Sequence, residues 1–130
     1  MASLLDVFIR YQSLFAKAVV LTIGLSIGTV LVSTFLGSLV AFMKISKNVV
    51  LKSIASAYVA FIRGTPLLVQ IYMVFYGLPI IGITFPSTEF LGTDFNLFIS
   101  GLIALIINST AYVCEIVRGG ILSINDGQME

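Results

Sequence analysis

The chain has 130 residues, of which 58% are hydrophobic and 10% charged, with a formal net charge of +1. A soluble domain of this size could not cover its surface with so few polar groups, so we expect lipid around most of the chain, and nothing in the charge points to nucleic acid. The absence of histidine, the single cysteine, and the lack of a phosphate-binding loop or a Ser/His/Asp set exclude a disulfide framework and disfavour an enzyme, so we predict no catalytic residue, metal or cofactor.

Three uncharged runs are each long enough to form a membrane-spanning helix. About 30 Å of hydrocarbon requires roughly 20 apolar residues in a helix, and a helix leaves no backbone group unpaired in lipid. The sequence therefore predicts one all-α, polytopic membrane domain over residues 1–130. The expected spans are about 18–43, 64–81 and 95–117.

The first run carries small residues at four-residue spacing. Such spacing lets helix backbones approach closely in lipid. Glycine is also simply common in membrane helices, so this interpretation stands beside that of a packing face. The small residues are Gly24, Gly28, Ser33, Gly37 and Ala41.

A break is expected before the second run. The segment 49–62 has a mixed helical pattern that favours an interfacial or cytoplasmic helix. It is followed by Arg63-Gly64-Thr65-Pro66, where proline suits the first turn of a new helix and Thr65 can cap it. We expect a separate straight segment from Pro66 to about Leu78.

The loops predict an orientation. Residues 44–52 carry three lysines and no acid, whereas residues 82–94 carry two acids and no base. Because Lys and Arg favour the cytoplasm, the first loop is expected inside and the second outside. This places the N-terminus outside, although Arg10 and Lys17 argue weakly against it.

A polar stripe marks the end of the third run. Asn108, Tyr112, Glu115 and Arg118 recur at helical spacing and share one face, and Arg63 is expected at a depth similar to that of Glu115. One interpretation is structural, with Glu115 paired to Arg118 or Arg63. The other is a substrate pathway lined by Asn108, Tyr112 and Glu115, since lipid disfavours such a stripe.

Two long motifs resemble a known family. "FIRGTPLLVQIYMVFYGLP" (residues 61–79) and "NSTAYVCEIVRGGILSINDGQME" (residues 108–130) are similar to the membrane permease subunits of bacterial ABC importers for polar amino acids. The resemblance runs from about Leu14 to the last residue. It implies the N-terminal part of a type I ABC importer permease fold in the bacterial plasma (inner) membrane.

The resemblance also implies partners. They are a cytoplasmic ABC ATPase that hydrolyses ATP, an extracytoplasmic amino-acid-binding protein, and a second permease subunit in a homo- or heterodimer. Residues 119–130 resemble the start of the EAA loop, which docks on the ATPase, with Gly127, Gln128 and Glu130 as coupling residues. On this interpretation the chain is expected to be truncated at that loop.

Two other functions remain open at this point. A small proton-coupled exporter would use Glu115 as its proton carrier, and a membrane anchor subunit would have no transport path. Only the permease hypothesis accounts for the tail "SINDGQME".

Overall fold

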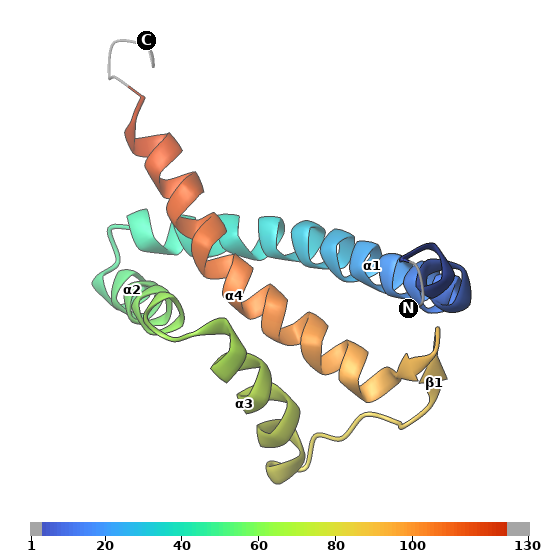
Figure 1. The fold of residues 1–130 in the computed structure, drawn as a ribbon. Helices are drawn as coiled ribbons and strands as arrows, with labels where there is room; N and C mark the ends of the chain where they lie inside the picture. Colours follow the sequence, from blue (N-terminus) through green and yellow to red (C-terminus); the bar gives the residue numbers. More distant parts are fainter. Residues whose placement is uncertain (1–3, 125–130) are drawn as a thin grey trace.

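The computed structural model describes residues 4–124 and is mostly helical, which confirms the predicted fold class (Figure 1). Its long helices surround a small core, and a short hairpin precedes the last helix. In chain order the elements are α1 (Leu4–Ile45), α2 (Val49–Gly64), α3 (Leu67–Ile80), β1 (Glu89–Phe90), β2 (Thr93–Asp94) and α4 (Phe95–Leu122).

Helices α1 and α4 pack side by side and run in the same direction. Gly28 lies against Leu102, and further along both helices Gly37 lies against Val113. A Cβ added to Gly37 would lie 2.6 Å from Val113 Cγ1. The small residues of the first run thus form a packing face at these two positions, because only glycine admits such close approach. Gly24 faces open space instead.

The core lies where α1, α2 and α4 meet. It is built from small and branched side chains, as expected where helix backbones come close together. Its buried members are Ala41, Val59, Ile62, Ala111 and Cys114.

The second apolar region is a bent pair of helices. Helices α2 and α3 meet at 106°, at the break expected around residues 63–66. Helix α3 has 14 residues, or about 21 Å, which is too short to cross the hydrocarbon alone. Helices α1 and α4 are each long and apolar enough to span, whereas α2 and α3 are long and apolar enough only as a bent pair. The helical segment expected from Pro66 to about Leu78 is present as α3.

The helix ends at the break also differ from expectation. Pro66 is the N-cap of α3 and makes no side-chain capping bond, whereas Thr65 closes α2 and its hydroxyl donates to Phe61 O at 3.1 Å. The capping role predicted for Thr65 is therefore wrong. At the start of α2 the Asn48 side chain accepts from Val50 N at 2.9 Å.

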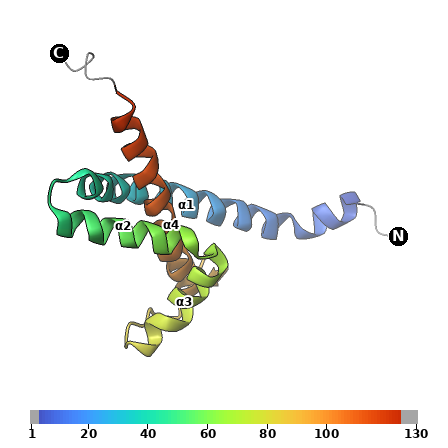
Figure 2. The ribbon, with the colours of Figure 1, turned by 90° about the vertical axis from the view of Figure 1, so that its left-hand side faces the viewer.

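Helix α1 is much longer than the run that predicted it. Its 42 residues would reach about 63 Å if straight, roughly twice the hydrocarbon thickness. The helix changes direction: its first turns are seen end-on in Figure 1 and run across the view in Figure 2. Thr22 and Ser26 hydroxyls donate to the carbonyls of Ala18 and Thr22, each at 2.7 Å, a type of bond that often bends helices.

The hairpin is a tight two-residue turn that delivers the chain into α4. Glu89 pairs with Asp94, and the turn residues Leu91 and Gly92 both have positive φ, at 51° and 81°. Such a turn matches the twist of a hairpin. The Asp94 carboxylate then accepts from Asn96 N at 2.9 Å and caps α4.

Candidate functional site

The polar face of α4 meets the break between α2 and α3 through two amide side chains. Asn108 Nδ2 donates to Gln70 Oε1 at 3.1 Å. Gln70 Nε2 donates in turn to Ile62 O at 2.8 Å and to Thr65 Oγ1 at 2.8 Å. Gln70 is buried, so each of these bonds replaces one that water cannot supply.

The amide pair has a clear structural purpose. The last carbonyls of a helix have no partner within that helix, and Ile62 lies in the last turn of α2. Gln70 adds a 2.8 Å bond to this carbonyl, which also accepts from Thr65 N at 3.4 Å, and Asn108 bonds Gln70 from α4. The 106° angle between α2 and α3 is thereby held against α4.

A cluster of charges lies further along α4, which we call the charge cluster: Lys44, Glu115 and Arg118. Glu115 Oε1 bonds the ammonium of Lys44, the basic residue in the last turn of α1, and Glu115 Oε2 accepts from Arg118 Nη2 at 3.1 Å. The side chains of Lys44 and Glu115 are only 19% and 20% exposed. The cluster therefore fastens the end of α1 to α4.

Arg63 does not form the ion pair with Glu115 that the sequence analysis considered. Its guanidinium lies over the ring of Tyr112, 5.5 Å from the centroid. Within residues 4–124 the ion pairs of Glu115 are those with Lys44 and Arg118. The Glu115–Arg118 pair agrees with the structural interpretation. The Glu115–Arg63 pair is wrong, because Lys44 and Arg118 bond the two carboxylate oxygens of Glu115.

The predicted pathway residues differ in exposure. Asn108 and Glu115 are partly buried and engaged with protein partners, whereas Tyr112 is 46% exposed. Gly127, Gln128 and Glu130 lie outside the described residues. Sequence reasoning missed Gln70 and Lys44; the signal for Gln70 was an amide in an otherwise apolar helix.

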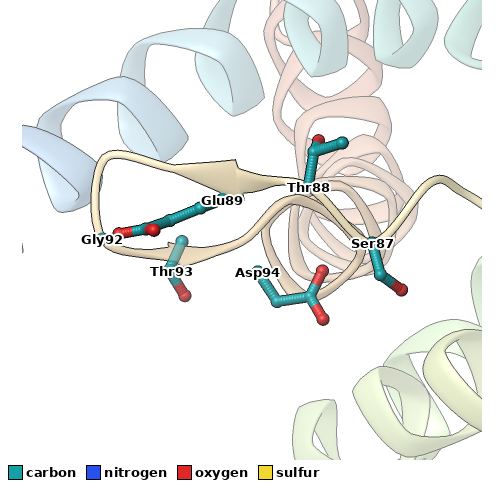
Figure 3. Close-up of a pocket in the computed structure, with 6 residues that line it drawn as sticks. All are labelled: Ser87, Thr88, Glu89, Gly92, Thr93 and Asp94. Atoms are coloured by element: carbon teal, nitrogen blue, oxygen red, sulfur yellow. The ribbon is translucent and has the colours of Figure 1, made fainter.

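A separate hollow of about 310 Å³ lies at the hairpin, at the opposite end of α4. Figure 3 shows Glu89 extending along the hairpin toward Gly92, while Ser87 and Asp94 point to the side opposite Thr88. Its lining is polar and acidic, and it is far from the charge cluster because α4 separates the two. The lining residues are Ser87, Thr88, Glu89, Gly92, Thr93 and Asp94.

Comparison with protein families gives a match over most of the chain. Residues 33–130 match the family described as "Binding-protein-dependent transport system inner membrane component". A solved structure described as an amino acid ABC transporter with histidines has a chain that is 36% identical, with a TM-score of 0.82. That match covers 98% of this chain and 55% of the other.

Curated relatives are named as transport permeases. A putative glutamine transport permease of Rickettsia prowazekii is 35% identical over 88% of this chain and 48% of its own length. A nopaline permease of Agrobacterium fabrum is 37% identical over 87% of this chain and 47% of its own. An arginine permease of Corynebacterium glutamicum is 34% identical over 92% and 39%. The chain spans about half the length of the curated relatives it matches.

Proposed function

The chain belongs to the family of inner membrane components of binding-protein-dependent transport systems, and we propose that it forms part of the substrate path of an ATP-driven amino-acid uptake system. The observation that carries this proposal is the 36% identity and 0.82 TM-score to a chain of an amino acid ABC transporter. ATP hydrolysis belongs to a cytoplasmic partner subunit in this scheme. An amino-acid-binding protein delivers the substrate from outside, and a second permease subunit completes the path.

The orientation in this proposal follows the loop charges. The hairpin and its acidic hollow face the outside, where the binding protein arrives, and the N-terminus lies on the same side. The charge cluster and the end of α4 face the cytoplasm, where the ATPase docks. Residues 127, 128 and 130 act as the coupling contact in this scheme.

The path itself is proposed to run beside the polar face of α4. Tyr112 is its best candidate lining residue, because a membrane helix rarely leaves a hydroxyl and a neighbouring guanidinium exposed to lipid. Asn108 and Glu115 do not line the path in this proposal; they hold α4 in position by bonding it to α3 and to α1. No finding favours a proton-coupled exporter, and Glu115 is held between two cationic side chains.

The test is transport by the assembled system in proteoliposomes with its ATPase and binding protein. Uptake of labelled glutamine, arginine and other polar amino acids is expected only with ATP inside the compartment that holds the ATPase. Absence of ATP-dependent amino-acid uptake by the assembled system would refute the proposal.

A variant tests the polar face within the same assay. Asn108→Leu is expected to lower uptake about tenfold while membrane insertion and subunit assembly persist, since the buried Gln70 amide loses its partner at a cost of about 1–3 kcal/mol. Ile116→Ala, on the same helix and 73% exposed, is the matched control and should transport normally. Unchanged uptake by Asn108→Leu would leave Asn108 a packing residue with no part in transport.

A further inference from the structure

The first turns of α1 carry a polar stripe along one side. Asp6, Arg10, Ser13 and Lys17 follow one another at intervals of four, three and four residues. This spacing places all four on one face of a helix. The stripe holds two bases and one acid, so it suits water and phospholipid headgroups and needs no strongly charged partner.

The opposite side of the same turns is aromatic. Phe8, Tyr11 and Phe15 lie there, and the Phe8 and Phe15 rings stack with centroids 5.7 Å apart. All three side chains are more than 40% exposed. Exposed aromatic side chains opposite a polar stripe are typical of a helix that lies at a membrane surface.

Lys17 fixes the level of this segment relative to the membrane. Its side chain lies over Gly92, so that a Cβ added there would meet Lys17 Cδ and Nζ at 3.1 Å. Gly92 belongs to the hairpin that leads directly into α4 at Phe95, the end of that membrane span. Lys17 is therefore at the edge of the hydrocarbon. If the helix continued straight, the turns before Lys17 would lie beyond the hydrocarbon.

We infer that residues 4–17 form an interfacial helix whose partner is the lipid surface on the hairpin side of the membrane. The change of direction along α1 allows these turns to leave the line of the span (Figure 2). The apolar side continues without a gap into Val19, Ile23 and Ile27, each more than half exposed on the span itself. Lipid covers the span, and the same lipid covers the aromatic side of the first turns.

The absence of tryptophan from the chain makes this testable with single fluorescent reporters. Phe15→Trp reports on the aromatic side, Ser13→Trp on the polar stripe, and Phe35→Trp on the exposed surface of the span. Each variant is reconstituted in phosphatidylcholine vesicles. Quenching is then measured with iodide in the water and with lipids brominated either near the headgroup or near the chain end.

Phe15→Trp is expected to be quenched most by bromines near the headgroup, and roughly threefold less by iodide than Ser13→Trp. Phe35→Trp should respond most to bromines near the chain end. Equal iodide quenching of the two N-terminal reporters would place both in water and overturn the inference. Protection of Phe15→Trp from every quencher would mean that protein, such as a second copy of the chain, covers this face, which also overturns it.

Phe8→Trp provides an independent reporter on the same side, in case the substitution at position 15 disturbs the helix. It should repeat the Phe15→Trp pattern. Depth quenching equal to that of Phe35→Trp at both positions would show that the segment enters the bilayer core, contrary to the inference. Continued burial of Cys114, measured by thiol labelling, confirms that each variant is folded.

Discussion

Replacing Gly37 with alanine should separate the two long helices. The added Cβ would lie 2.6 Å from Val113 Cγ1, 2.7 Å from Val113 Cβ and 3.0 Å from Thr110 O. Carbon atoms in contact normally lie about 3.5–4.0 Å apart. Rotation of the valine side chain can move Cγ1, but its Cβ and the Thr110 carbonyl are fixed to the backbone. Helix α4 must therefore move as a whole.

The control for this variant is Gly24→Ala on the same helix, where no atom lies within 4 Å of the added Cβ. Both variants gain about 1 kcal/mol of helix propensity, because alanine replaces glycine in each. Their difference isolates the overpacking at Gly37, which is about 1–3 kcal/mol. At about 4 °C per kcal/mol for a domain of this size, Gly37→Ala should unfold about 4–12 °C below the control.

Cys114 supplies the assay. It is the chain's one cysteine and is fully buried in the core between the helices. A thiol-reactive fluorophore in detergent therefore reports unfolding without an engineered cysteine. If Gly37→Ala unfolds at or above the temperature of Gly24→Ala, the two helices do not pack at the distance described and the reasoning fails.

Two further predictions concern the charge cluster and the orientation. Lys44→Met and Glu115→Gln, alone and combined, should show a coupling energy of about 1 kcal/mol by thermal unfolding, since the pair is only partly shielded from solvent; simple additivity would mean that the ion pair contributes nothing. In a Cys114→Ala background, cysteine at Thr88 should react with membrane-impermeant maleimides in intact cells and cysteine at Ser46 only with permeant ones, and the opposite pattern would reverse the proposed orientation.

Much of the fold followed from composition and local signals. The uncharged runs predict the long helices, because lipid imposes the same length requirement on every crossing. The break at residues 63–66 was visible in glycine and proline. The Glu115–Arg118 pair was visible because both residues lie one turn apart on one helix.

The contacts that fix the site were out of reach of such reasoning. Lys44 meets Glu115 across 71 residues of sequence, and this requires knowing that α1 and α4 run parallel and how far each is displaced along the other. Gln70 bonds Asn108 across 38 residues for the same reason. The start of α1 at Leu4 was missed because charges at Asp6, Arg10 and Lys17 interrupt the apolar run without interrupting the helix.

The bend between α2 and α3 has a consequence for biogenesis. When α2 and α3 leave the ribosome, the amide of Gln70 and the carbonyls at the end of α2 can reach each other, but Gln70 still lacks Asn108, which is synthesised 38 residues later. At about 5–20 residues per second this interval lasts on the order of 2–8 seconds. During that time, release of this short helix into lipid would be unfavourable, because its amide would lack one of its hydrogen-bond partners there. The insertion machinery should therefore hold α2 and α3 until α4 emerges, and the three helices should enter the bilayer together.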